Sequence, residues 1–126
     1  MSLRTPLSKV RGLGSAKEGT NHFWHQRVTA IANVPLVLGF LLIVLMSLGK
    51  GHADVAALLG SPLAVIFMLL AIGSITWHMR LGMQVIIEDY IHGEGLKLCL
   101  LLLNKFFCVA LAVAGAYAVL KLGFAS

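Results

Sequence analysis

The chain has 126 residues, of which 59% are hydrophobic and 12% are charged, and its mean hydropathy is +0.91. Because an ordinary soluble domain has roughly 25% charged residues, these values predict a membrane protein with little chain left for a soluble catalytic domain. The formal net charge is +5. The polar surface is nevertheless too small to build a nucleic-acid reader, and we expect no nucleic-acid partner.

Residues 1–27 are predicted to form a cytoplasmic tail with an interfacial segment. The stretch is polar and basic, and it lacks the short apolar core of a cleaved secretory signal. Pro6, Gly12 and Gly14 are expected to interrupt any amphipathic helix here. His22 and His25 are expected to line a subunit interface, and we assign them no ligand role.

Three apolar stretches predict an all-α membrane protein whose transmembrane anchor domain covers residues 28–126. We place its three transmembrane helices at about 28–48, 62–87 and 96–122, joined by polar, turn-rich connections. The first stretch carries no charge and is long enough for a bilayer core of about 30 Å. Because three helices enclose little by themselves, we expect the chain to be part of a multi-subunit helical bundle.

The basic residues predict the orientation of these helices. By the positive-inside rule, their bias places the N-terminus in the cytoplasm and the C-terminus in the periplasm. We expect Lys105 of the third helix to extend towards the inner surface, and its neighbour Asn104 to face another helix. The predicted inner side carries seven basic residues and the outer side two: Arg4, Lys9, Arg11, Lys17, Arg27, Arg80 and Lys97 against Lys50 and Lys121.

The two cysteines, Cys99 and Cys108, lie nine positions apart within an apolar stretch. This spacing fits neither a disulfide framework nor a zinc site. We expect both to be small buried hydrophobic residues.

His78 lies within the second helix, where an ionisable side chain is costly and is often functional. With 3.6 residues per turn it shares a face with Ala71, Ser74 and Gly82, a shallow stripe along which a flat macrocycle could lie. Imidazole is a common axial ligand of haem iron. The alternative is a packing histidine that is hydrogen-bonded to a neighbouring helix or that reaches the interface. A six-coordinate haem would need its second ligand from another subunit.

Asp89 and Tyr90 follow His78 by 11 and 12 residues. If the helix persists, this spacing predicts a carboxylate and a phenol about 16 Å from His78, above the same face at the inner surface. A phenol can hydrogen-bond a quinone oxygen, and a carboxylate can relay protons. The alternative is an interfacial tyrosine beside a helix-ending acid. Arg27 could pair with a haem propionate or act as an inner-surface anchor.

Two motifs contain these candidates. They are His25-Gln-Arg27-Val-Thr29-Ala30, and His78-x-Arg80-x-Gly82 followed after six residues by Asp89-Tyr90. Together with the three-helix layout, they resemble the D-type hydrophobic membrane anchor subunits of succinate dehydrogenase, respiratory complex II, in their bacterial and alphaproteobacterial-like form. The resemblance covers almost the whole chain.

This resemblance implies a non-flavin subunit of an inner-membrane enzyme that transfers electrons from succinate to quinone. His78 would be one axial ligand of a haem b shared with a second hydrophobic anchor subunit of the C type, cytochrome b556-like. Arg27 would lie near the haem propionates, and Tyr90 would hydrogen-bond ubiquinone beside Asp89. Electrons would arrive from a flavoprotein subunit through an iron-sulfur subunit on the inner face.

Three alternatives stay open from the sequence. The first is a purely structural anchor whose histidine only packs. The second is an anchor of a quinol:fumarate reductase without a haem role. The third is a small transporter component in which His78 and Lys105 line a water path.

Overall fold

The computed structural model describes residues 3–12 and 18–125. All regular elements in these ranges are α-helices: α1 (Pro6–Arg11), α2 (Glu18–Ser47), α3 (His52–Leu59), α4 (Pro62–Tyr90) and α5 (Glu94–Phe124). Three of them, α2, α4 and α5, are long and apolar enough to cross a membrane. The predicted all-α fold with three transmembrane helices is therefore confirmed.

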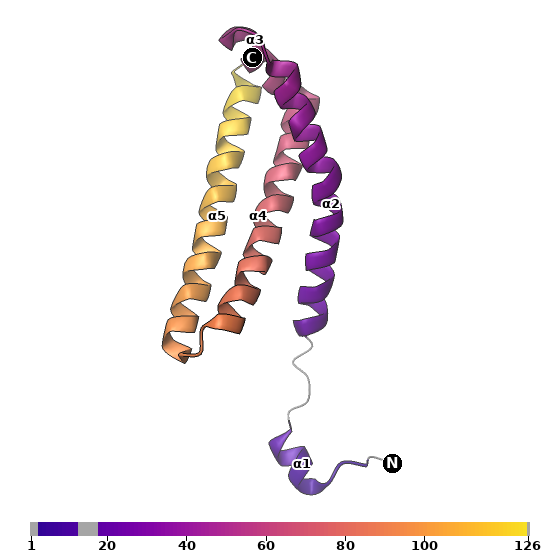
Figure 1. Cartoon of the computed structure of the whole chain (residues 1–126), viewed down its shortest axis with the longest axis vertical. Coiled ribbons are helices and arrows are strands. Elements are labelled where there is room, and N and C mark those ends of the chain that lie inside the picture. Colours follow the sequence, from indigo (N-terminus) through magenta and orange to yellow (C-terminus); the bar gives the residue numbers. More distant parts are fainter. Residues whose placement is uncertain (1–2, 13–17, 126) are drawn as a thin grey trace.

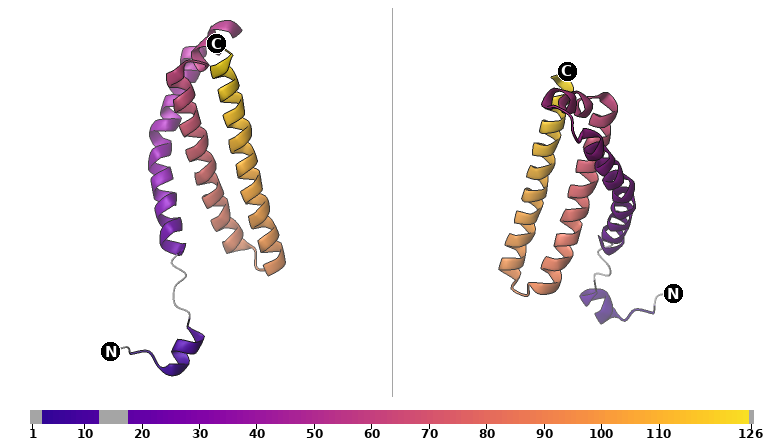
Figure 2. Two further views of the ribbon diagram at one scale, coloured as in Figure 1. Left: turned by 180° about the vertical axis from the view of Figure 1, so that it is seen from behind. Right: turned by 45° about the horizontal axis from the view of Figure 1, so that its top comes forward.

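The three long helices form a single row with α4 in the middle (Figure 1). Helix α4 packs against α2 on one side and α5 on the other, and the two outer helices do not contact each other along their described residues. Short α3 contacts all three at one end, whereas the α4–α5 turn and the start of α2 lie at the opposite end, as both views in Figure 2 show. The α4–α5 turn and the start of α2 are thus at the same end of the helices.

The helices extend beyond the apolar stretches that predicted them. Helix α2 begins at Glu18 instead of near residue 28, α4 continues to Tyr90, and α5 runs from Glu94 to Phe124. The reason is physical: apolarity marks the part of a helix that lipid can cover, but the backbone hydrogen bonds continue into the polar residues beyond it.

Two short helices replace segments that were expected to be irregular. Helix α3 lies within the connection predicted to be turn-rich, because its Ala- and Leu-rich sequence favours a helix and Asp54 complements the helix dipole in the first turn. Pro6 begins α1 instead of interrupting it. The Thr5 side chain caps that helix by accepting a hydrogen bond from the Ser8 backbone N–H at 3.1 Å, and Gly12 ends it.

A single layer of three helices buries little of its own surface. No large side chain among the described residues is fully buried, and the buried set comprises Ala64, Ala71, Leu81, Ile87, Cys108 and Val119. Cys108 is buried as expected, but Cys99 is exposed, because it lies on a side of α5 that no other helix covers. Both broad faces of the row are therefore available to lipid or to helices of partner subunits.

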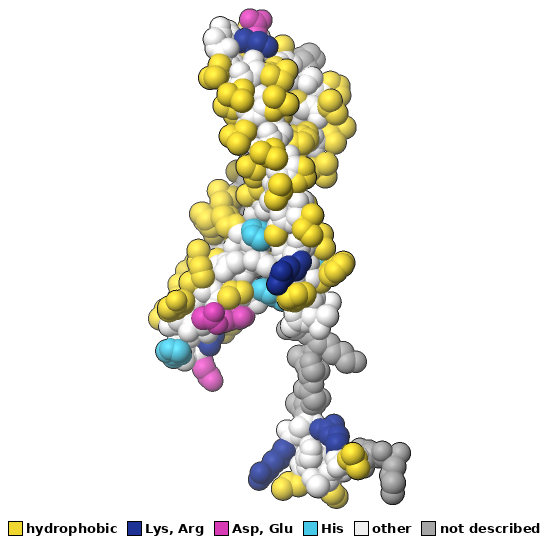
Figure 3. All heavy atoms as spheres, turned by 45° about the vertical axis from the view of Figure 1, so that its right-hand side comes forward, with side chains coloured by type: hydrophobic (Ala, Val, Ile, Leu, Met, Phe, Trp, Pro, Cys, Tyr) yellow, Lys and Arg dark blue, Asp and Glu magenta, His cyan; other side chains and the backbone are white. Residues whose placement is uncertain are grey.

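The polar side chains concentrate towards one end of the row. In Figure 3, histidine and charged side chains gather over the lower part of the bundle, and hydrophobic side chains cover the upper part as far as a charged pair at the top. The candidate site lies within this polar half.

Candidate functional site

A line of polar side chains joins α2 to α4 around His78. The half-buried His78 ring places Nδ1 3.0 Å from the Thr29 Oγ1 of α2. One helical turn away, Ser74 Oγ donates a hydrogen bond to Asn33 Oδ1 at 2.6 Å. We call Gln26, Thr29, Asn33, Ser74 and His78 the polar seam. In a membrane helix pair, such contacts hold the two helices in one register.

The partners of Thr29 indicate which ring nitrogen of His78 carries the proton. The single Thr29 hydroxyl proton is donated to the His25 backbone carbonyl at 2.6 Å, with the Gln26 carbonyl at 3.2 Å. With the hydroxyl proton placed on that carbonyl, Thr29 Oγ1 accepts from the Nδ1–H of His78, which is the tautomer that fits these contacts best. This tautomer leaves the Nε2 lone pair available, and no described residue hydrogen-bonds to Nε2. Histidines that bind metals commonly donate their other ring N–H in this way.

The shallow stripe on α4 is partly covered by α2. Ala71 is buried, and Gln26 Nε2 lies 3.9 Å from the position that a Cβ at Gly82 would occupy. Small residues allow two helices to approach closely, and here α2 contacts part of the stripe. The expectation that a macrocycle lies along this stripe stays a prediction, and the partly exposed His78 ring remains accessible from outside the helix pair.

Two polar atoms, one of them in the polar seam and one close to it in the sequence, have no partner within the described part of the chain. They are His22 Nε2 and Gln26 Oε1, and both are buried. A buried polar atom without a hydrogen bond costs free energy, so a group from outside the described residues is expected to pair with each of them.

The aromatic and basic residues near the seam pack on one another. The exposed Arg27 guanidinium lies 4.7 Å from the centre of the Phe23 ring. His25 meets Trp77 of α4 edge-on, with ring centroids 5.8 Å apart. These contacts leave the Arg27 side chain at the surface of the row, where a ligand of another subunit can reach it.

The structure places Asp89 and Tyr90 on different sides of α4. The helix runs without a break through both residues, so Asp89 returns to within about 20° of the His78 direction while Tyr90 lies about 120° from it. Tyr90 is 77% exposed and lines an apolar groove of about 560 Å³ between α4 and α5, with Met79, Met83 and Phe107. The prediction that both residues stand above the His78 face therefore holds only for Asp89.

Thr29 belongs to the first of the two motifs, but its contact with His78 was not predicted from the sequence. The signal in the sequence that could have revealed this contact is a hydroxyl side chain in an apolar helix, at the depth of a histidine in a second helix. By contrast, the prediction that Asn104 faces another helix is confirmed, because its Nδ2 donates to the Arg80 carbonyl of α4 at 3.0 Å. Cys108 Sγ in turn donates to Asn104 Oδ1 at 3.5 Å.

No three His, Cys, Asp or Glu side chains of residues 3–12 and 18–125 gather closely enough to hold a metal ion alone. A metal group at His78 would thus take at most two such ligands from the described residues.

Known proteins resemble the chain over most of its length. The family described as the succinate dehydrogenase/fumarate reductase transmembrane subunit matches residues 1–112. A succinate dehydrogenase hydrophobic membrane anchor subunit of Rickettsia bellii is 37% identical, covering 95% of this chain and 96% of the relative. The corresponding subunit of Paracoccus denitrificans is 30% identical, covering 94% and 92%. A succinate dehydrogenase membrane anchor subunit of Reclinomonas americana is 31% identical, covering 74% and 80%.

No solved structure matches the chain. The family match and these relatives agree with the three membrane-length helices and with the resemblance noted in the two motifs. The chain therefore belongs to the family of succinate dehydrogenase and fumarate reductase transmembrane subunits.

Proposed function

We propose that this membrane anchor subunit of succinate dehydrogenase supplies one axial ligand of haem b and part of a ubiquinone site. The carrying observation is the 3.0 Å contact between His78 Nδ1 and Thr29 Oγ1, because Nδ1–H donation to this oxygen would leave Nε2 as a lone-pair donor at the surface of the row. A packing histidine would also make this bond. A haem ligand, unlike a packing histidine, also requires that Nε2 have no protein partner. Among the described residues, Nε2 has none.

The residues of the seam fit a haem ligand. Thr29 holds the ring in one tautomer and one orientation, and His78 would hold the iron through Nε2, while the haem supplies one-electron transfer when bound. The second axial ligand would come from the C-type anchor subunit. Arg27 would pair with a propionate, because its exposed guanidinium has no carboxylate partner in the described part of the chain.

The quinone site is proposed at the inner end of α4. The Tyr90 hydroxyl would donate a hydrogen bond to a ubiquinone carbonyl oxygen, and the apolar groove beside it suits the ring and its tail. Asp89 is exposed on the neighbouring side of the helix, where it would pass protons from water towards the quinone. Both side chains are open to partner subunits, so this chain would form one wall of the site.

The partners proposed are the C-type anchor, the iron-sulfur subunit and the flavoprotein subunit. The support is the single-layer row with two uncovered faces, which needs lipid or partner helices to bury its apolar surface. For Tyr90 to meet the iron-sulfur subunit, the α4–α5 turn must face the cytoplasm, as the basic residues predict. A reporter fused after Ser126 should then be active in the periplasm, and a cytoplasmic signal would refute this orientation.

The haem role is tested with His78→Ala in the assembled complex. Loss of one axial ligand should abolish or shift the b-type absorption spectrum, because the iron becomes five-coordinate or the haem is lost. The matched control is His52→Ala, which removes a histidine of α3 at the opposite end of the row. A wild-type spectrum in the assembled His78→Ala complex would show that the iron is bound elsewhere.

The quinone role is tested with Tyr90→Phe, which deletes only the hydroxyl. One hydrogen bond lost to a neutral acceptor should lower quinone reduction by up to roughly tenfold, since such a bond contributes about 0.5 to 1.5 kcal/mol. Succinate oxidation with an acceptor upstream of the quinone site should stay unchanged. Tyr117→Phe is the matched control, because Tyr117 is an exposed tyrosine of α5 outside the groove. Equal quinone reduction by both variants would remove Tyr90 from the site.

A further inference from the structure

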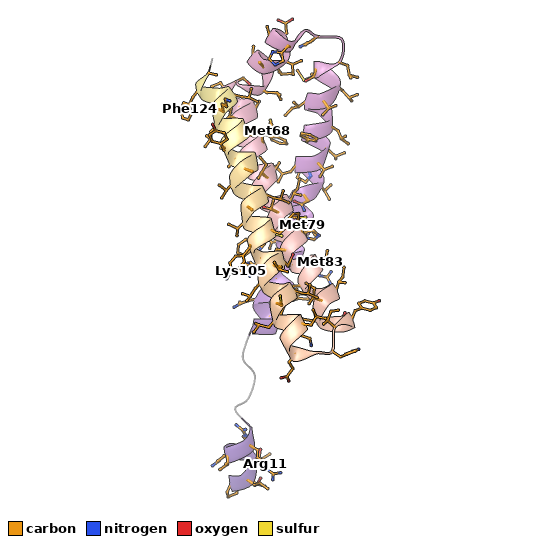
Figure 4. The ribbon with its side chains drawn as sticks, turned by 90° about the vertical axis from the view of Figure 1, so that its left-hand side faces the viewer. Arg11, Met68, Met79, Met83, Lys105 and Phe124 are labelled. Carbon is orange, nitrogen blue, oxygen red and sulfur yellow. The ribbon has the colours of Figure 1, made fainter. Side chains whose placement is uncertain are left out.

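A second groove lies on the other side of the α4–α5 pair from the Tyr90 groove. It has a volume of about 200 Å³ and is lined by Arg80 and Gln84 of α4, by Lys105 of α5, and by Leu98, Leu101 and Leu102. We call it the basic groove. Figure 4 shows Lys105 on one side of α5, and Met79 and Met83 on the other. The two grooves therefore open on opposite faces of the row.

The two cations of the basic groove lack an anionic partner. No carboxylate of the described residues forms a salt bridge with Arg80 or Lys105. The nearby Glu88 does not line the groove, and it accepts a hydrogen bond from Gln84 Nε2 at 2.9 Å. Arg80 lies over the Trp77 ring at 5.3 Å, which positions the guanidinium without neutralising it.

In the predicted orientation, Arg80 and Lys105 both lie below the inner membrane surface at a similar depth. Lys105 is eleven residues from the start of α5 and Arg80 ten residues from the end of α4, or about 15 to 16 Å along each axis. A 31-residue helix is about 46 Å long, so a centred α5 extends about 8 Å beyond each side of a core of about 30 Å. The Cα atoms of both residues thus lie about 7 to 8 Å inside the hydrocarbon, where a charge is costly unless its long side chain carries it to the surface.

The groove provides a route for that extension. Leu98, Leu101, Leu102 and Lys105 have the spacing of one helix face, with the leucines on the side of Lys105 nearer the inner surface. The aliphatic stem of Lys105 can cover these leucines while its ammonium rises to headgroup level. Arg80 points about 200° around α4 from His78, which directs it away from the proposed haem ligand.

We propose that the basic groove binds the phosphate of an anionic phospholipid. Arg80 and Lys105 both line this groove, so one anion at the boundary where lipid phosphates lie would meet both cations, and basic grooves between transmembrane helices on the cytoplasmic side suit acidic headgroups. A lipid phosphate is favoured over a partner carboxylate because the Lys105 ammonium must extend towards the headgroup level to leave the hydrocarbon, and Arg80 lines the same groove. The lipid would fasten α4 to α5 on the face opposite Tyr90.

The test is lipid binding by the purified, delipidated complex, followed by native mass spectrometry as phosphatidylglycerol is added. Each basic residue near a membrane surface contributes about fivefold in affinity, so Arg80→Gln with Lys105→Gln should weaken binding about 30-fold. The charge-conserving pair Arg80→Lys with Lys105→Arg should bind as wild type. The matched control is Lys50→Gln with Lys121→Gln, which removes two cations at the opposite end and should leave this binding unchanged.

Several results would overturn the proposal. The first is that wild type and the neutral pair, Arg80→Gln with Lys105→Gln, bind phosphatidylglycerol equally. The second is that wild type binds phosphatidylcholine and phosphatidylglycerol equally. The third is that inorganic phosphate displaces the lipid. If the neutral pair does not assemble, the single changes Arg80→Gln and Lys105→Gln decide the matter, each with an expected loss of about fivefold. A wild-type complex that binds no phosphatidylglycerol would likewise refute the lipid site.

Discussion

Replacing Thr29 with valine tests whether the seam positions His78 for a ligand role. The change keeps the shape of the side chain but removes the oxygen that lies 3.0 Å from His78 Nδ1. A half-buried N–H left without an acceptor costs about 1 to 3 kcal/mol, equivalent to about 5- to 150-fold in an equilibrium constant. Loss of a partner that orients a metal-binding histidine typically lowers metal affinity by 10- to 100-fold, in the same range. We therefore expect haem to dissociate from the Thr29→Val complex at least about tenfold faster.

The assay follows b-type absorbance while an excess of a haem-accepting apoprotein captures released haem. The matched control is Thr76→Val, because the Thr76 hydroxyl donates only to the Ile72 and Gly73 carbonyls of its own helix. Thr29→Ser retains the hydroxyl and should restore slow release. The haem midpoint potential should also rise in Thr29→Val, since an imidazole without this bond donates less electron density to iron. Equal haem release and equal potentials in Thr29→Val and Thr76→Val would refute the positioning role.

Two further changes test the packing that holds the seam together. Gly39→Val should lower the stability of the complex by about 1 to 3 kcal/mol, because a Cβ there would overlap the Phe67 ring. The control is Gly73→Ala, whose added Cβ meets no atom within 4 Å and which should be nearly neutral in thermal unfolding. Ser74→Ala removes the bond to Asn33 and should cost about 0.6 kcal/mol while the haem spectrum persists. An unchanged melting temperature in Gly39→Val or Ser74→Ala would contradict the corresponding contact.

Much of the fold was predictable because membrane-spanning helices are specified locally. Length and hydropathy were enough to predict three helices, since each such segment must satisfy its own backbone hydrogen bonds in lipid. The same local cost made His78 conspicuous before any packing was known. The ends of the helices were less predictable. Hydropathy declines where lipid ends, but α2 continues through polar residues as far back as Glu18.

Which side chains meet depended on how the helices pack. The spacing of Ala71, Ser74, His78 and Gly82 correctly placed them on one face of α4, but it could not show that α2 contacts part of this face. It also could not pair His78 with Thr29, because their contact joins residues 49 positions apart.

The sequence by itself determined the membrane class, the three helices and the histidine that makes a haem role worth testing. Only the tertiary structure decided that Thr29 contacts His78, that Tyr90 faces the α4–α5 groove, and that Arg80 and Lys105 share a second groove behind it. The physical reason is that periodicity defines the faces of one helix but not which neighbour each face meets. That choice depends on close packing between helices, and it positions the side chains proposed to bind haem, quinone and lipid.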